Sequence, residues 1–107
     1  MTDVREISPA ALRELLAAAE PPLLLDVRNP WEAEICSIDG SHLIPLNSLP
    51  QHLHELSRSR PVAVYCHHGV RSLMAAQYLA SAGFDAVSVS GGIERWAREI
   101  EPDMARY

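Results

Sequence analysis

The run VAVY at positions 62–65 constrains the fold most, because it is uncharged, rich in β-branched residues and preceded by Pro61. Such a run predicts a strand. The apolar run at 23–27 predicts a strand buried on both faces, as occurs in parallel sheets covered by helices. The residues from about Arg71 to Ala82 predict a helix, with Gly83 as its C-cap. The start of this helix is apolar over most of its circumference, so we expect it to be largely buried.

The same alternation of helical and strand-like segments continues along the chain. Ser8-Pro9 predicts a helix start, and a second amphipathic helix is expected from Ser48. Further segments follow in the same order: a strand at 23–27, a helical turn through Ile35, a brief strand around Leu43-Ile44, a strand at 86–89 and a helix containing Ile93 and Trp96. Together they predict an α/β fold with a mostly parallel sheet covered on both faces.

Length and composition exclude several classes of protein. The 107 residues fit one domain, 1–107, and the nine basic residues, all arginine, against fourteen acidic ones give a net charge of −5. We therefore expect no nucleic-acid partner, and no segment is suited to a membrane. The start MTDVREIS lacks a secretory pattern, which predicts a cytoplasmic protein. Neither the two cysteines nor the five histidines have metal-site spacing, so we expect no metal and no cofactor.

Cys66 is the candidate nucleophile, because it stands where the strand at 62–65 ends and a helix follows. Ligand crevices of open α/β sheets lie at such carboxyl ends. If the loop curls, its amides form an anion cradle that, with the helix dipole and the Arg71 cation, favours a thiolate. Gly69 allows the turn, whereas nothing near Cys36 offers such a setting. An inert buried cysteine is the disfavoured alternative. The candidate binding loop is His67, His68, Gly69, Val70, Arg71 and Ser72.

Four stretches of the chain resemble the rhodanese family in order and spacing: LLLDVRNPWE at 23–32, IDGSHLIPL at 38–46, YCHHGVRS at 65–72 and GFDAVSVSGGIERW at 83–96. The resemblance implies an open parallel sheet of about five strands with helices on both faces. It also implies a sulfurtransferase of the thiosulfate:cyanide type that carries sulfane sulfur as a persulfide on Cys66. The implied partners are a small donor such as thiosulfate and an acceptor that is cyanide or a thiol, including a protein thiol.

Two other functions are compatible with this kind of fold. A phosphatase or arsenate reductase of the Cdc25-like kind has five residues between cysteine and arginine, whereas only four separate Cys66 from Arg71. The shorter loop favours one sulfur atom over a tetrahedral oxyanion. A binding or regulatory module of the same fold often lacks the cysteine, so Cys66 disfavours this second alternative. The physiological donor, acceptor, pathway and oligomeric state stay open.

Three charged residues are candidates for a supporting role. Asp26 and Arg28 belong to the DVR stretch, and a loop-fixing ion pair is favoured over a direct place in the crevice. Glu32 either pairs with Arg71 or is a solvated acid in the first turn of a short helix.

Aromatic and imidazole side chains carry weaker expectations. Those of His67 and His68 either bind an anionic donor when protonated or point to solvent. Trp31 and Trp96 are expected to pack against the protein. The stretch IDGSHLIPL departs from the commoner HIPGA-like form of the family, and the tail 99–107 indicates no function.

Overall fold

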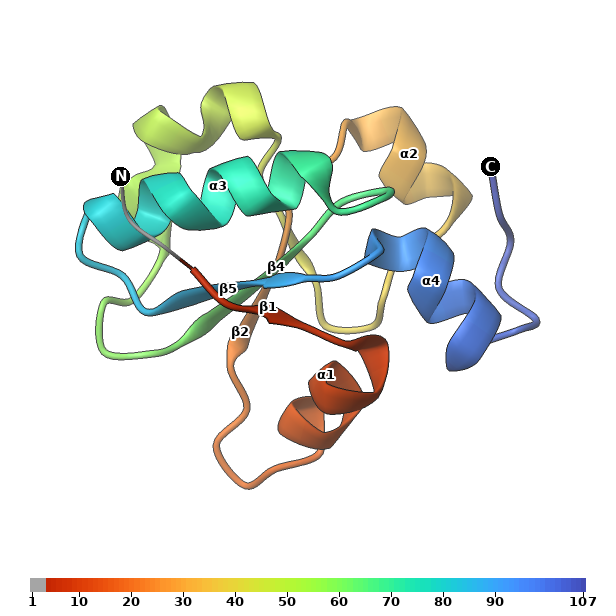
Figure 1. Ribbon diagram of the computed structural model, residues 1–107. Coiled ribbons are helices and arrows are strands. Elements are labelled where there is room, and N and C mark those ends of the chain that lie inside the picture. The colour runs from red at the N-terminus through yellow and green to blue at the C-terminus, as the bar shows by residue number, and fades with distance from the viewer. Residues whose placement is uncertain (1–3) are drawn as a thin grey trace.

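The computed structural model describes residues 4–107; residues 1–3, at the start of the MTDVREIS segment, lie outside the described part. Five parallel strands form one sheet in the order β1-β5-β4-β2-β3 (Figure 1). The strands are β1 (Glu6–Ile7), β2 (Leu23–Asp26), β3 (His42–Leu43), β4 (Val62–Tyr65) and β5 (Ala86–Val89). The predicted α/β fold is confirmed. Only β1 was not predicted, because two residues are too short to show a pattern.

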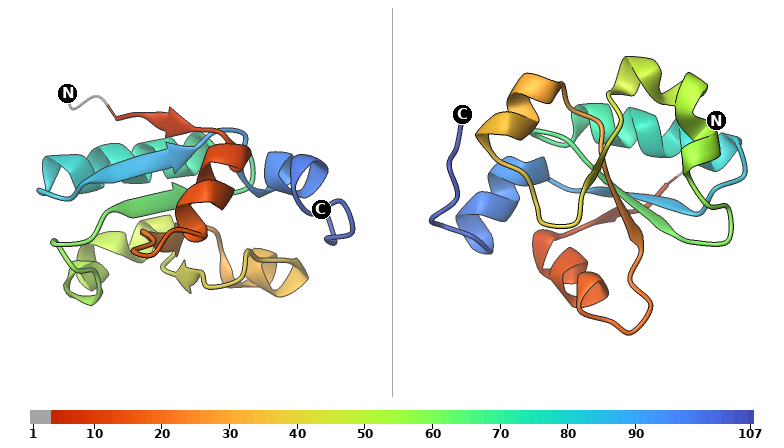
Figure 2. Two further views of the ribbon diagram at one scale, coloured as in Figure 1. Left: turned by 90° about the horizontal axis from the view of Figure 1, so that it is seen from below. Right: turned by 180° about the vertical axis from the view of Figure 1, so that it is seen from behind.

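Helices cover both faces of this sheet. They are α1 (Pro9–Leu16), α2 (Pro30–Ile35), the 3₁₀ helix η1 (Leu46–Glu55), α3 (Val70–Ser81) and α4 (Gly92–Glu99). Figures 1 and 2 show α3 and η1 on one face and α1 with α4 on the other. None of the helices in residues 4–107 has the length and apolar character needed to cross a membrane.

The central strand β4 lies between β5 and β2, and all four of its residues are buried. Val62 and Val64 pack into the core on the α3 side, whereas Ala63 and Tyr65 pack on the side of α1 and α4. Burial on both faces is typical of a central strand in a parallel sheet covered by helices. The predicted strand at 62–65 is confirmed, and it places Cys66 at the carboxyl end of the sheet.

An amphipathic helix was predicted from Ser48. The segment after β3 does have a buried apolar face, but it is a 3₁₀ helix that begins at Leu46. Leu49 and Leu56 are buried as expected. Pro50 lies inside the segment and cannot donate a backbone hydrogen bond, which favours short i→i+3 turns over a regular α-helix. One such turn ends the segment, where the amide of Leu56 donates to the carbonyl of Leu53 at 3.1 Å.

Two predictions of burial were wrong. Helix α3 buries one side only, through residues such as Ala75 and Leu79, while Val70 is 70% exposed and Met74 is 56% exposed. A helix lying on one face of a sheet has no neighbour on its outer side, whatever its apolar content. Trp31 is also 56% exposed, whereas Trp96 is buried as predicted.

The start of α4 lies directly against the loop that follows β4. The amide of Ile93 donates to the carbonyl of Cys66 at 2.8 Å, and the amide of Glu94 donates to that of His67 at 3.1 Å. Gly92 permits this approach: its φ is +60°, and an added Cβ would lie 2.5 Å from the Cys66 oxygen and also against the His67 oxygen. The contact therefore needs glycine at position 92.

We predict that Gly92→Ala destabilises the protein more than Gly40→Ala. Both glycines have positive φ, but an added Cβ at Gly40 meets nothing within 4 Å. Backbone strain alone should cost about 1 to 2 kcal/mol at Gly40, and displacement of the loop carbonyls should raise the cost at Gly92 by roughly a further 1 to 3 kcal/mol. Urea denaturation of both variants measures the difference, and equal losses would contradict the close contact.

Candidate active site

The thiol of Cys66 lies inside a tight turn between β4 and α3. Its Sγ accepts hydrogen bonds from the amides of Gly69 at 3.1 Å and Ser72 at 3.3 Å, and the residue is 1% exposed. Gly69 is the N-cap of α3 and has a φ of +105°, the left-handed conformation that allows the chain to turn back over the sulfur. The loop therefore directs backbone donors at a single sulfur atom.

Further amides of the loop are free to bind an anion. A trans peptide holds its C=O and N–H in opposite directions, and the carbonyls of Cys66 and His67 bond to α4. The amides of His67 and His68 consequently point away from α4. Together with those of Val70 and Arg71, at the first turn of α3, they have no acceptor among residues 4–107. Free amides at a helix N-terminus form an anion-binding site.

A pair of buried serines extends from the sulfur into the core. Ser72 Oγ lies 3.4 Å from Cys66 Sγ and 2.8 Å from Ser88 Oγ, and both serines have no exposed surface. Ser88 was missed in the sequence, although a hydroxyl within the otherwise apolar β5 was a usable signal. The Ser72 hydroxyl therefore gives the sulfur a second, deeper contact, and Ser88 holds that hydroxyl in place.

Arg71 forms a bidentate pair with Glu32 of α2. Its Nη1 and Nη2 donate to the two carboxylate oxygens at 2.7 Å and 2.9 Å, and Glu32 is 3% exposed. The hydrogen bonds from Arg71 lower the pKa of Glu32 to about 2, and Glu32 in turn raises the pKa of Arg71. Of the two alternatives predicted for Glu32, the structure shows the ion pair with Arg71. This pair fixes the guanidinium beside the loop.

Asp26 and Arg28 form a buried ion pair beneath the site. The Arg28 Nε and Nη2 donate to the two oxygens of Asp26 at 2.9 Å and 2.8 Å, and Nη2 also donates to the Cys36 carbonyl at 2.7 Å. Neither residue exceeds 1% exposure, so neither lines an open crevice. Tyr65 donates to Asp26 at 3.1 Å, and burial raises the pKa of this phenol to about 12. The pair ties the end of β2 to α2 and β4.

The tail brings an unexpected side chain to this network. The Tyr107 hydroxyl donates to Glu32 Oε2 at 2.7 Å and accepts from Arg28 Nη1 at 3.0 Å. Its ring stacks on His67 with centroids 3.8 Å apart, and His67 stacks on the exposed His68 at 3.9 Å. Burial, together with the neighbouring His68, lowers the pKa of His67. No sequence pattern in the tail pointed to Tyr107.

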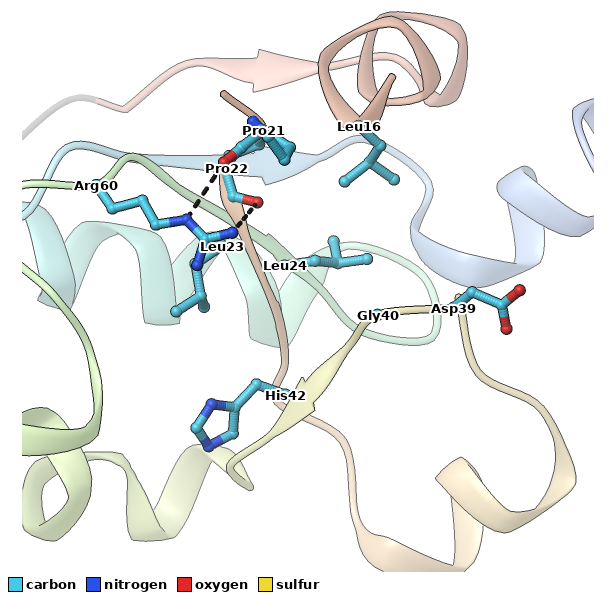
Figure 3. Close-up of a pocket in the computed structure, with 9 residues that line it drawn as sticks. All are labelled: Leu16, Pro21, Pro22, Leu23, Leu24, Asp39, Gly40, His42 and Arg60. Atoms are coloured by element: carbon cyan, nitrogen blue, oxygen red, sulfur yellow. Dashed lines mark hydrogen bonds between the residues drawn. The ribbon is translucent and has the colours of Figure 1, made fainter. Parts of the chain in front are cut away.

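A separate pocket lies at the opposite end of the strands. It is lined near the amino ends of β2 and β3 by residues that include Leu24, Asp39 and His42, and Arg60 closes one side by donating to the carbonyls of Pro21 and Pro22 (Figure 3). It contains no cysteine and is remote from the carboxyl ends where Cys66 lies. Across residues 4–107, no group of three or more His, Cys, Asp or Glu side chains is placed to hold a metal ion.

An open parallel sheet with a cysteine in an amide cradle at its carboxyl end defines a class of folds rather than one family. Residues 8–99 match the family described as the Rhodanese-like domain. The chain belongs to this family, as the four sequence stretches indicated.

Two of the relatives carry the word sulfurtransferase in their names. The chain is 42% identical over 104 residues to the probable adenylyltransferase/sulfurtransferase MoeZ of Mycobacterium tuberculosis, covering 94% of this chain but 26% of MoeZ. It is 36% identical to a protein named sulfurtransferase from Allochromatium vinosum, covering 95% and 96% of the two chains. The crystal structure of a rhodanese-related protein from Thermoplasma volcanium superposes with a TM-score of 0.84 at 39% identity, covering 92% and 95%.

We predict that the Glu32–Arg71 pair makes stability depend on pH in the acid range. The pKa of Glu32 is lowered from 4.5 to about 2, so its contribution is fully present above pH 4.5 and is lost as pH falls through about 2. Arg71 is 33% exposed, which limits the contribution to on the order of 2 kcal/mol. Urea denaturation between pH 2 and pH 7 should therefore show a shallower acid loss in Glu32→Gln. The control is Glu34→Gln, an exposed acid on the same helix, and an unchanged slope in Glu32→Gln would refute the assignment.

Proposed function

We propose that this protein transfers sulfane sulfur from thiosulfate, or a donor of the same chemistry, through a persulfide on Cys66. The observation that carries the proposal is the loop itself. Amides of Gly69 and Ser72 contact Sγ, further amides of the loop have no acceptor among residues 4–107, and Arg71 adds a cation that Glu32 fixes. Such donors stabilise an anionic sulfur without a general base, because neither step of the reaction requires removal of a proton from the substrate.

The first step is a displacement at sulfur. The Cys66 thiolate attacks the outer sulfur of thiosulfate, a sulfur–sulfur bond forms on the enzyme, and the bond within thiosulfate breaks. Sulfite leaves with the electron pair, and the enzyme keeps the sulfur as an anionic persulfide. The negative charge stays near the cradle in both states. Loop amides that stabilise the thiolate therefore also stabilise the product of this step.

The second step regenerates the thiolate. A thiophilic acceptor, either cyanide or the thiolate of a small molecule or protein, attacks the terminal sulfur, and the bond to Cys66 Sγ breaks. The electron pair returns to Sγ, so the protein ends in its starting state.

Both Cys36 and Cys66 are free thiols, which suits a reducing compartment such as the cytoplasm.

In this proposal each member of the loop has a defined part. Cys66 is the catalytic residue. The amides of the loop bind the anionic sulfur and the incoming donor, and Arg71 adds a cation whose orientation Glu32 fixes. Asp26 and Arg28 act indirectly, because they tie the end of β2 to α2, the helix that carries Glu32. The loop members that bind are His67, His68, Gly69, Val70, Arg71 and Ser72.

The persulfide is the direct test. After incubation with thiosulfate, intact mass should show one added sulfur atom that a reductant removes, and a peptide map should place it on Cys66. Cys66→Ser should abolish both this adduct and the turnover of thiosulfate with cyanide. Cys36→Ser is the matched control and should retain both. Turnover that persists without Cys66 would overturn the proposal. An unmodified Cys66 in the wild-type protein would favour a binding module instead.

Arg71 should contribute to sulfur uptake separately from its contribution to stability. We predict that Arg71→Ala slows persulfide formation by on the order of 10-fold to 100-fold, because a cation beside the developing anion is lost. That variant also leaves Glu32 buried without its partner and should lower stability. The double variant Arg71→Ala/Glu32→Gln removes both charges, so stability should recover while uptake stays slow. Recovery of uptake together with stability would mean that the backbone amides suffice.

A further inference from the structure

Tyr107 joins the two charged pairs of the site. Its hydroxyl accepts from Arg28 Nη1 at 3.0 Å and donates to Glu32 Oε2 at 2.7 Å, the same oxygen that receives Arg71 Nη2 at 2.9 Å. Glu32 has only one further donor among the described residues, the amide of Asn29 at 3.0 Å. The phenol therefore supplies one of the four hydrogen bonds that hold this buried carboxylate.

The ring of Tyr107 also braces the nucleophile loop. It lies almost parallel to the imidazole of His67, with centroids 3.8 Å apart and an interplanar angle of 15°. His67 directly follows Cys66, and its carbonyl is fixed from the other side by the amide of Glu94. The ring of Trp31 packs against the Tyr107 ring in a T-shaped arrangement, with centroids 5.8 Å apart. The first residue of the loop is thus held by α4 through its backbone and by Tyr107 through its side chain.

We propose that Tyr107 is a positioning residue for sulfur transfer: through Glu32 it fixes the Arg71 guanidinium beside Cys66, and through His67 it holds the loop in its anion-binding shape. This inference rests on the proposed function, which supplies the reaction that Arg71 and the loop serve. Among residues 4–107, Tyr107 makes no hydrogen bond to Cys66, so it acts through other residues.

The two contacts of Tyr107 separate experimentally. Tyr107→Phe keeps the stacked ring and removes the hydroxyl, whereas Tyr107→Leu removes both. Tyr78→Phe is the matched control, because Tyr78 lies on α3 and is 38% exposed. Its hydroxyl has no hydrogen-bond partner within residues 4–107.

The first measurement does not require turnover. Iodoacetate and iodoacetamide alkylate the same thiol but differ in charge, so the ratio of their rates with Cys66 reports the positive potential that Arg71 creates. We expect Tyr107→Phe to lower this ratio on the order of threefold or more, because the Arg71 guanidinium is then held less firmly. Tyr78→Phe should leave the ratio unchanged. A proportional change in both rates, with an unchanged ratio, would mean a merely structural role and would overturn the inference.

The second measurement connects Tyr107 to the reaction. Tyr107→Phe should slow persulfide formation from thiosulfate on the order of tenfold, mainly through a higher KM, because the dianion binds less firmly. In the Arg71→Ala background the same substitution should have little further effect, since its target is gone. Equal losses in both backgrounds would overturn the inference.

Failure of the inference differs from failure of the proposed function. If wild-type Cys66 takes up no sulfur, the proposed function is wrong, and the alkylation ratio still tests whether Tyr107 positions Arg71. If wild-type uptake proceeds and Tyr107→Phe matches wild type within twofold in both measurements, only the role of Tyr107 is refuted. Tyr107→Leu should be slower than Tyr107→Phe, because the loop then also loses the ring on His67.

Discussion

The two hydrogen bonds between the start of α4 and the loop after β4 determine how the site works. Ile93 and Glu94 donate to the carbonyls of Cys66 and His67, and the trans peptide then turns the next amides away from α4. Without this contact the loop carbonyls would compete with its amides for the space around the sulfur. The close approach depends on Gly92, where a side chain would strike both carbonyls. Gly92, at the start of α4, thus allows the contact that leaves amides rather than carbonyls facing the cradle, which suits an anion and not a cation.

Charge around this cradle is arranged in layers. The innermost donors are backbone amides, which carry no net charge and do not titrate. Outside them Arg71 is fixed by Glu32, and beneath them Arg28 is fixed by Asp26, so each cation has a buried carboxylate as its partner. The bidentate bond from Glu32 holds the Arg71 guanidinium in one orientation. The cost is an added negative charge near an anionic substrate, and the amides offset it at closest range.

Much of the fold and the centre of the site could be predicted from the sequence, for local reasons. The uncharged run at 62–65 and the turn at Gly69 are encoded in neighbouring residues, and so is the cysteine between them. What sequence reasoning missed depends on contacts over long separations. Tyr107 meets Glu32 across 75 positions, and no periodicity in the tail announces that contact. The exposure of Trp31 was missed for a different reason, since composition cannot tell which side of a short helix faces the core.

A net charge of −5 repels a dianionic donor at long range, so the attraction must arise locally. Interactions between exposed charges fade over about 8 to 10 Å at physiological ionic strength, whereas those in a buried loop are screened far less. Amides within about 3 Å of the sulfur and one fixed guanidinium therefore outweigh distant carboxylates once a donor enters the loop. The acidic surface acts mainly on the rate of encounter. Under the proposed function, selectivity for sulfur over a tetrahedral oxyanion follows from geometry, because only four residues separate Cys66 from Arg71.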